Sequence, residues 1–361
     1  MAKLVRRQHV VSQFYLKGFA NEANQLRRVV LPGDKSHIVS SSDASVIRDF
    51  YTVTLPDGSQ SDIFERTFSE IEKPAADALR SVREGEWSLR DEPRAALSLW
   101  IALQHLRGED VRSSQTQFKA TLIRLTVGVS GKAALREIIE KAEARTISDE
   151  ELEWEWQDLT KPGGPTLMPE INGHLKVLMS LHNGMSRYLY DAHWTVFRFT
   201  RRALVTSDRP VAMTVAPDYP PEHGVGIFTA DAFLVPLSRR AAVMIQPRDR
   251  TPDANAPDFE IAGTAMVARS INQEIVRHAS RSIYHHPDDS PLEGLYLPQP
   301  GRRDPNADIG SGLIKEEGLF AGLSKEQLKA FSPPSPSAND SKGMTIKDLP
   351  WPIPGRIKPE R

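Results

Sequence analysis

The amino-acid sequence predicts an α+β fold, with a helical block packed on an antiparallel sheet and a poorly structured C-terminal tail. Helical spacing of apolar residues dominates residues 62–191, whereas short apolar segments joined by short loops follow over residues 194–245. Strands joined in this way pair antiparallel, and separate helical and strand regions are typical of α+β domains. Towards the C-terminus Pro, Ser, Gly and Asp dominate. We therefore expect one α+β domain over residues 1–286 and a Pro-rich extended or partly disordered tail over residues 287–361.

The N-terminal elements begin with a short helix that opens at Ser12. Strands over residues 25–31 and 50–54 follow, because β-branched residues alternate or run together there. We expect both strands to join the later sheet. The helix turns its apolar side chains inward: Phe14, Tyr15, Leu16 and Phe19.

The helical block is predicted from apolar spacing and capping signals. Its first helix starts at about residue 62, and Pro74 kinks or splits it. Ser148-Asp149-Glu150-Glu151 is a capping box that opens a later helix. The other segments are residues 93–127, with Phe118 turned inward, residues 132–145 and residues 168–191.

The later elements are mainly strands, followed by a last helix from about residue 264 to residue 284. A short helix over residues 319–331 is the one element expected in the tail. The strands are expected over residues 194–199, 204–206, 211–215, 232–237 and 241–245.

Composition excludes several classes of protein. The 361 residues contain no cysteine, which excludes disulfides, zinc–thiolate sites and a thiol nucleophile. The net charge of −1 argues against a bulk electrostatic nucleic-acid binder, although basic pairs such as Arg239-Arg240 leave a local nucleic-acid contact open. The start lacks the apolar core of a signal peptide, and no run approaches the roughly 18 apolar residues of a membrane helix. We expect a cytoplasmic protein without a membrane partner.

Two glutamates on the first long helix are candidate site residues. Glu65 and Glu72 lie seven residues apart, so their carboxylates share one helix face. Such a pair can hold a divalent cation or supply an acid and a base. The alternative is a solvated face flanked by Arg66 and Lys73.

Two further polar groups end an apolar helical stretch. Gln104 and Arg107 are three residues apart and therefore lie near one face. Arg107 can clamp a phosphate or carboxylate with two hydrogen bonds. The alternative is an arginine that neutralises the C-terminal end of the helix dipole.

The loop Thr206-Ser207-Asp208-Arg209-Pro210 follows a predicted strand, where functional polar residues are often held. Asp208 can ligate a metal or act as a base, and Ser207 can act as a nucleophile. The alternative is ordinary turn chemistry. The chain lacks the Gly-x-Ser-x-Gly elbow, which argues against a serine hydrolase.

The segment Arg7–Phe19 places polar His9 and Gln13 beside apolar anchors, where a polar side chain must find a partner or do chemistry. From His9 onward it resembles the opening of an uncharacterised, mostly bacterial domain-of-unknown-function family. Members of that family begin with a His-x-x-Pro-Gln-Phe-Tyr-Leu-x-x-Phe-like motif. Here Ser12 stands in place of the usual proline.

The resemblance spans roughly residues 7–285 and implies no reaction. Four later blocks of the family pattern also have counterparts in this chain. These are Glu65 and Ile71-Glu72 on one helix, Gln104 and Arg107, Thr206–Pro210, and Pro236–Ser238. It implies that the polar residues of these blocks gather in one site, or alternatively form a buried polar network. The residues concerned are His9, Gln13, Glu65, Glu72, Gln104, Arg107 and Asp208.

Our first functional hypothesis is a metal-dependent hydrolase, phosphodiesterase- or nuclease-like, in a phage-defence or mobile-element setting. Glu65, Glu72 and Asp208 would hold Mg, Mn or Zn, to which oxygen and imidazole ligands are suited. His9 would be the general base or a further ligand, and Arg107 would stabilise the developing anion. Gln13 and Asp208 complete the candidate catalytic set.

Two alternatives stay open at this stage. In the first, the same polar cluster belongs to a non-catalytic module that binds a ligand or partner. The tail, with Trp351 between Pro350 and Pro352, would then dock a protein partner. In the second, the polar set only braces the fold.

Overall fold

The computed structural model describes residues 4–55, 57–216, 218–219, 225–251, 253–300 and 346–360. The chain contacts divide it into two compact units. Unit 1 contains the residues up to Val111 and those from Ile171 to the end of the described stretch at residue 300. Unit 2 contains Arg112–Glu170 together with the described residues 346–360. This division differs from the expected single domain over residues 1–286, because unit 2 buries a hydrophobic cluster of its own.

The main sheet of unit 1 has five strands in the order β12-β7-β11-β10-β9. All neighbours pair antiparallel except β12 and β7, which pair parallel. The strands are β7 (His193–Arg198), β9 (Ala212–Thr214), β10 (Ala232–Ser238), β11 (Ala241–Gln246) and β12 (Phe259–Ala262). The short 3-10 helix η3 (Arg248–Arg250) follows β11.

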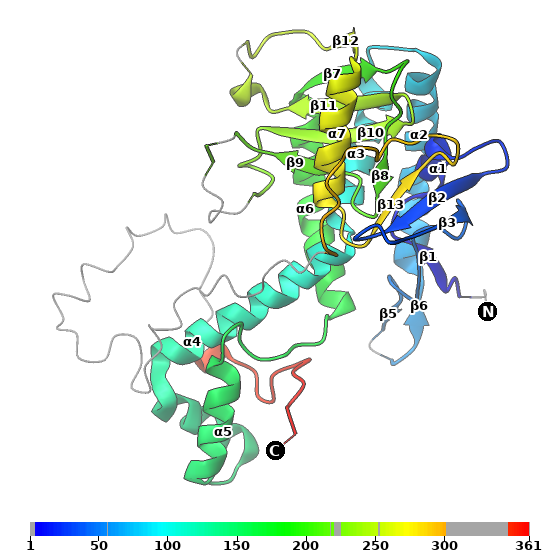
Figure 1. The fold of residues 1–361 in the computed structure, drawn as a ribbon. Coiled ribbons are helices and arrows are strands. Elements are labelled where there is room, and N and C mark those ends of the chain that lie inside the picture. The colour runs from blue at the N-terminus through cyan, green and yellow to red at the C-terminus, as the bar shows by residue number, and fades with distance from the viewer. Residues whose placement is uncertain are drawn as a thin grey trace. The chain divides into compact units, whose positions relative to one another are not determined.

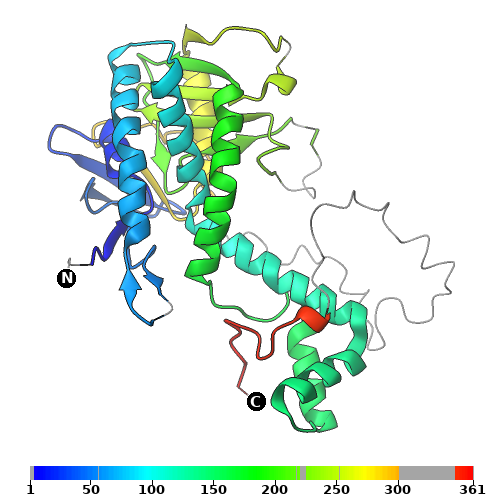
Figure 2. The same ribbon diagram turned by 180° about the vertical axis from the view of Figure 1, so that it is seen from behind.

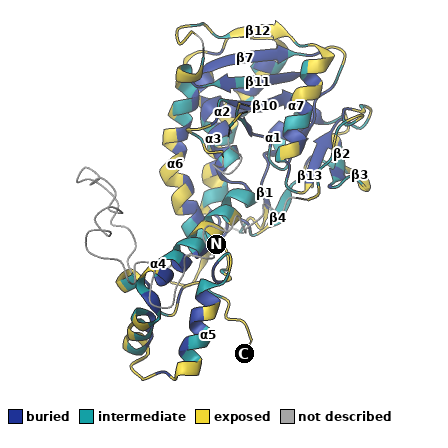
Figure 3. Ribbon diagram, turned by 60° about the vertical axis from the view of Figure 1, so that its left-hand side comes forward, coloured by how far each residue is buried: buried dark blue, intermediate teal, exposed yellow. Residues whose placement is uncertain are grey.

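Helices cover both faces of this sheet. α7 (Ala265–His278) lies on one face, and α2 (Ile63–Glu84), α3 (Asp91–Leu106) and α6 (Ile171–Asp191) lie on the other (Figures 1 and 2). Six of the seven residues of β10 are buried, since a strand covered on both faces reads as a continuous apolar run. Figure 3 shows the central strands buried and the edge strand β12 exposed. The predicted α+β class, with helices packed on an antiparallel sheet, is confirmed.

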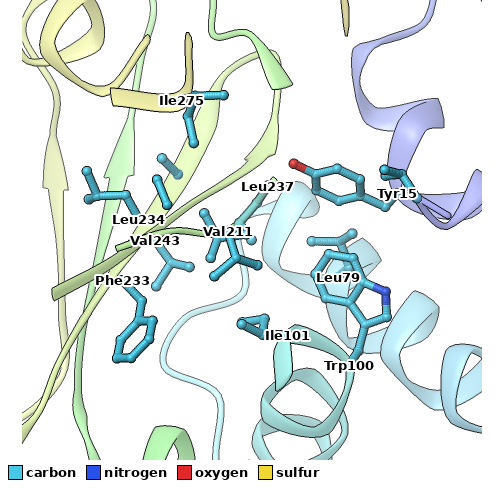
Figure 4. Packing of buried hydrophobic residues seen from close by; sticks show 14 of the residues in the cluster. Tyr15, Leu79, Trp100, Ile101, Val211, Phe233, Leu234, Leu237, Val243 and Ile275 are labelled. Carbon is cyan, nitrogen blue, oxygen red and sulfur yellow. The ribbon is translucent and has the colours of Figure 1, made fainter. Parts of the chain in front are cut away.

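The core of unit 1 lies between these layers. Figure 4 shows Ile275 of α7 towards one side of the sheet and Trp100 and Ile101 of α3 towards the other. Tyr15 from the N-terminal segment packs on Trp100, with ring centroids 5.0 Å apart. The aromatic side chains near the N-terminus therefore belong to the same core as the sheet.

A second sheet of unit 1 has the order β3-β2-β13-β8. Its strands are β2 (Gln25–Val30), β3 (Lys35–Ser40), β8 (Thr206–Ser207) and β13 (Ser282–His285). The predicted helix from residue 264 to residue 284 is therefore wrong over residues 279–284. The helix stops at His278. The backbone N–H groups of Ser280, Arg281 and Ser282 donate to the carboxylate of Asp208, and not to the carbonyl groups of a continuing helix.

The N-terminal segment forms a strand and a short helix. β1 (Arg7–His9) pairs antiparallel with β4 (Val46–Arg48). α1 (Gln13–Leu16) begins after Ser12, as predicted, and continues into the 3-10 helix η1 (Lys17–Phe19). Tyr15, Leu16 and Phe19 are buried, whereas Phe14 is half-buried. A small ribbon of β5 (Val53–Thr54) and β6 (Gln60–Ser61) precedes α2, which runs without a break through Pro74.

Unit 2 is built on most of α4 (Glu109–Glu143) and on α5 (Asp149–Thr160). The predicted helical segment 93–127 is divided between α3 and α4 at Arg107-Gly108. Gly131 breaks α4 with a φ of 80°, which agrees with the separate segments predicted on either side of it. Phe118 is 70% exposed, so its predicted inward orientation is wrong. Its neighbours Ile123 and Val127 make the hydrophobic contact.

The described parts of the predicted tail pack on the rest of the chain. Residues 287–300 lie on unit 1, where Arg202 donates to the carbonyls of Pro291 and Glu293. In unit 2, Leu349 and Ile353 are buried beside α5, after the 3-10 helix η4 (Ile346–Asp348). The predicted helix over residues 319–331 lies outside the described residues.

Charged groups hold the C-terminal segment in unit 2. Arg356 forms ion pairs with Glu155 and Asp158 of α5, and all three side chains are at most 3% exposed. The indole N–H of Trp351 donates to Glu143 at 3.0 Å. The aromatic residue proposed to dock a protein partner is therefore engaged within its own chain.

No helix among the described residues is long and apolar enough to cross a membrane.

Replacement of Ile353 by alanine tests the role of this segment. We expect the free energy of amide opening in α5 to fall by about 2–4 kcal/mol, because a buried aliphatic side chain is removed. Hydrogen exchange over residues 149–160 measures it. Ile357→Ala is the matched control, since Ile357 is 47% exposed and its loss should change stability by about 0.5 kcal/mol or less. Unchanged protection of α5 in Ile353→Ala would contradict the assignment of residues 346–360 to the core of unit 2.

Candidate functional site

A buried serine hydroxyl is the centre of the candidate site. Ser12 stands at the N-cap position of α1, yet its side chain makes no capping bond. Its Oγ donates to Glu72 Oε1 at 2.7 Å and accepts from Trp100 Nε1 at 2.8 Å. It also accepts from Nη2 of Arg107 at 2.6 Å. Ser12 thereby connects the N-terminal segment to α2 and to α3.

Arg107 is the charged partner of this hydroxyl. It caps the C-terminus of α3, and its side chain is 1% exposed. Nη1 donates to Glu72 Oε1 at 2.8 Å, and Nη2 also donates to Gln104 Oε1 at 2.8 Å. The amide of Gln104 in turn donates to the carbonyl oxygen of Val10 at 2.9 Å. We name Ser12, Glu72, Trp100, Gln104 and Arg107 the Ser12 network.

The Ser12 network reaches solvent on the side of α2. The Glu72 side chain is 24% exposed, and both its bonds to Ser12 and Arg107 fall on Oε1. Glu65 lies on the same helix face, and burial raises the pKa of its carboxyl to about 7. The charge of Arg107 opposes this rise, while Glu72 and Asp62 add to it. The predicted shared face of Glu65 and Glu72 is therefore a half-buried carboxyl pair beside a buried guanidinium.

His9 lies at the same edge. Burial lowers the pKa of its imidazole, and the contact of Nε2 with the Ser42 carbonyl oxygen, 3.2 Å away, opposes that shift. Glu72 and Arg107 both act on its charge, which places all three in one electrostatic environment. Gln13 is half-buried, and its side chain forms no hydrogen bond with the described residues.

Asp208 has a different role. Its carboxylate accepts backbone N–H bonds from Ser280, Arg281 and Ser282 at 2.9, 2.7 and 3.1 Å. Burial raises the pKa of Asp208, and these three donors oppose the rise. The structure therefore uses Asp208 to shape the chain between α7 and β13.

Ser207 follows the turn chemistry that the sequence left open. It is fully buried, and its hydroxyl both donates to the carbonyl of Arg209 at 2.9 Å and accepts from its N–H at 3.1 Å. A hydroxyl closed into its own turn has no access to a substrate.

A metal centre was predicted at Glu65, Glu72 and Asp208. Across the described ranges, no group of three or more His, Asp or Glu side chains is arranged to hold a metal ion. The oxygens of Asp208 are occupied by backbone donors, and one oxygen of Glu72 is occupied by Arg107 and Ser12. Metal binding stays a prediction.

Two members of the Ser12 network, Ser12 and Trp100, are not among the site residues predicted from the sequence. The sequence predicts only that a short helix opens at Ser12. A buried indole N–H requires an acceptor, so an apolar helix that contains tryptophan indicates a polar partner nearby. A proline at position 12, as in the resembled motif, would supply neither the hydroxyl nor the N–H that faces Gln104 at 3.3 Å.

Comparison with known proteins identifies the family. A family model described as a protein of unknown function (DUF4238) matches residues 7–289. The chain belongs to this family. The match contains the whole Ser12 network, His9, Glu65 and Asp208, and it confirms the resemblance to an uncharacterised domain family. Neither a search of curated proteins nor a search of solved structures found a match.

Ser12→Ala tests the Ser12 network. The variant leaves the indole N–H of Trp100 and one N–H of Arg107 without their acceptor, so we expect a loss of about 1–3 kcal/mol in the free energy of unfolding. Urea unfolding followed by tryptophan fluorescence measures it. Ser69→Ala on the exposed side of α2 is the control, with an expected change of about 0.5 kcal/mol or less. Equal stability of the two variants would show that the hydroxyl contributes nothing.

The raised pKa of Glu65 predicts how stability depends on pH. The pKa of Glu65 is about 7 in the folded protein and 4.5 in the unfolded chain. The contribution of the protonated carboxyl to the free energy of unfolding is therefore complete below pH 4.5, and it is lost as the pH rises through about 7. Glu65→Gln carries no such charge, so its advantage over the wild type should grow across this window. We expect about 1–2 kcal/mol by pH 8, after discounting for partial exposure.

Urea unfolding at pH 5 and pH 8 measures this difference. Glu70→Gln is the matched control on the same helix, because Glu70 is exposed. A Glu65→Gln variant whose stability tracks the wild type at both pH values would rule out the raised pKa.

Proposed function

We propose that the protein is a hydrolase that cleaves a phosphodiester bond by acid–base chemistry at the solvent edge of the Ser12 network. One observation carries the proposal. Glu65, with a carboxyl pKa raised to about 7, shares a helix face with Glu72, which is ion-paired to Arg107. Two carboxyl groups in unequal environments are the usual source of an acid and a base in one site.

The roles follow from the contacts. Glu72 activates water through Oε2, since Oε1 already accepts from Ser12 and Arg107. Glu65 retains its proton near neutral pH and delivers it to the leaving oxygen. The water oxygen forms the new bond to phosphorus, and one water proton moves to Glu72 while the other stays on the product phosphate. The ester P–O bond breaks, and the leaving oxygen takes the proton of Glu65. A phosphodiester requires both proton transfers, which the pair divides between its members.

The other residues act around this pair. Burial lowers the pKa of His9, so its imidazole is neutral at pH 7 and serves as a second proton acceptor. Arg107 is a positioning residue, because a guanidinium that is 1% exposed cannot reach a substrate. Asp208 braces the fold through its three backbone hydrogen bonds and takes no part in the proposed proton transfers. A nucleic acid is the phosphodiester partner that we propose.

A divalent metal is the second way to activate water at this edge. The donor types of Glu65, Glu72 and His9 suit Mg, Mn or Zn. A bound ion would lower the pKa of its water and neutralise phosphate charge. The described residues offer no such trio arranged around one point, so the proposed steps do not pass through a metal. A setting in phage defence is part of the same proposal.

A non-catalytic binding module is the second candidate. The closed bonding of Ser12, whose hydroxyl contacts Glu72, Trp100 and Arg107 at 2.8 Å or less, favours it. A network of this kind gives a rigid surface for a ligand without requiring turnover.

The test is hydrolysis of single- and double-stranded DNA, of RNA and of bis-p-nitrophenyl phosphate, each with EDTA, Mg²⁺ or Mn²⁺. We expect Glu65→Gln and Glu72→Gln to lower kcat by about 10²- to 10⁴-fold, the usual contribution of one acid or base. Glu70→Gln should leave kcat unchanged. The rate of the wild type should fall above pH 7, as Glu65 loses its proton, and this limb should be absent in Glu65→Gln.

Two results would oppose the proposal. Full activity of Glu65→Gln would remove the acid from the mechanism. Absence of product in every arm, together with a substrate-dependent thermal shift that Glu65→Gln loses, would favour the binding module instead.

A further inference from the structure

A cavity of about 230 Å³ lies in unit 1 between the β1–β4 ribbon, the second sheet and the start of α4. Val10, Val46 and Ile47 form an apolar part of its lining. Arg28 and Tyr284 line it from β2 and β13, and Asp208 lines it from the loop after β8. We name this cavity the Arg28 pocket.

The carboxylates of the Arg28 pocket already have partners. Asp110 pairs with Arg209 at 2.7 Å, and Glu109 pairs with Arg281 at 2.6 Å. The remaining two are engaged as well, since Asp43 pairs with Arg7 and Asp208 accepts its three backbone N–H bonds. Two of the three arginines in the lining are thereby neutralised.

Arg28 is the third arginine, and it forms no ion pair within the described part of the chain. It stands directly opposite Tyr284 in the antiparallel register of β2 and β13, so the two side chains share a sheet face. Its Nε donates to Ser282 Oγ at 3.0 Å, which orients the guanidinium. The two terminal amino groups have no protein acceptor among the described residues. A half-buried guanidinium whose terminal N–H groups have no acceptor is suited to bind an oxyanion.

We propose that the Arg28 pocket binds a small molecule through a phosphate or carboxylate group on the Arg28 guanidinium. The apolar body of the ligand packs against the apolar part of the lining, which Val10 and β4 supply. A planar guanidinium binds either group with two parallel hydrogen bonds. Pockets for small ligands combine apolar walls with a few placed polar groups, as this one does. The inference goes beyond the proposed function, because it requires no turnover at Glu65.

The Arg28 pocket and the Ser12 network are structurally connected. Val10 lines the pocket, and its carbonyl oxygen accepts from Gln104 of the network. Glu109 and Asp110, which follow Arg107 by two and three residues, line the pocket as well. A ligand in the pocket therefore lies against the same N-terminal segment that supplies Ser12.

The test is calorimetric titration of the full chain with phenyl phosphate, benzoate, inorganic phosphate and phenol. We expect phenyl phosphate or benzoate to bind, and phenol, which lacks the oxyanion, to bind at least about tenfold more weakly. Arg28→Gln should weaken the oxyanion ligand about 10- to 100-fold, the usual effect of removing charge-assisted hydrogen bonds. Arg27→Gln is the matched control, because Arg27 precedes Arg28 in β2 and points to the opposite face.

A second variant keeps the inference testable if Arg28→Gln does not fold. Val46→Asp leaves Arg28 in place, but it puts a carboxylate in the apolar wall and should abolish binding of the oxyanion. Tighter binding of phenyl phosphate than of benzoate identifies a phosphate group, and the reverse order identifies a carboxylate. No heat from either oxyanion at millimolar concentration would overturn the proposal, and so would equal affinity for phenol or unchanged affinity in Arg28→Gln. Calorimetry measures ligand binding without turnover, so a negative result here is distinguishable from a negative result in the hydrolysis assay.

Discussion

The buried positive charge of Arg107 is the constraint on which the candidate site depends. A guanidinium that is 1% exposed must be paired and hydrogen-bonded, because an uncompensated buried charge is strongly destabilising. Arg107 therefore binds Glu72 of α2 and Ser12 of the N-terminal segment, and it holds both at the end of α3. These contacts fix the rotation of α2. Since Glu65 lies almost two turns before Glu72, the same rotation sets Glu65 half-buried at the solvent edge.

A second buried carboxyl group, that of Asp208, organises a different part of unit 1. Asp208 is buried and accepts three consecutive backbone N–H groups. These bonds end the helical path after α7 and turn the chain into β13, which pairs with both β2 and β8. The position of Arg28 opposite Tyr284, and hence the Arg28 pocket, follows from that pairing. Asp208, in the loop after β8, thus helps to determine the position of Arg28 in the pocket.

Neighbouring parts of unit 1 have separate proposed tasks. We propose proton transfer for the carboxyl pair at the edge of the Ser12 network, and recognition of an oxyanion for the Arg28 pocket. Val10 belongs to both, because its carbonyl oxygen accepts from Gln104 and the residue lines the pocket. The buried bonding of Ser12 makes this junction rigid, which suits a preorganised site and equally suits a binding surface.

The sequence by itself determined the α+β class, the strands β7, β9, β10 and β11, and the shared faces of Glu65 with Glu72 and of Gln104 with Arg107. These properties follow from local periodicity, because a spacing of three or seven residues on a helix has one geometric meaning. Through the family resemblance the sequence also grouped seven polar residues, of which Asp208 has a separate role in the structure. The seven are His9, Gln13, Glu65, Glu72, Gln104, Arg107 and Asp208.

Only the tertiary structure decided the other features. The strand β13 and the role of Asp208 depend on bonds between residues more than 70 positions apart, which no local pattern contains. The same is true of Ser12, whose partners lie 60 to 95 positions away, and of Arg28 opposite Tyr284. Packing of residues 346–360 against α5 likewise required the fold, because Pro-rich composition describes only the local chain. Charge pairing over long sequence separations therefore decided the site, while short-range spacing decided the elements that carry it.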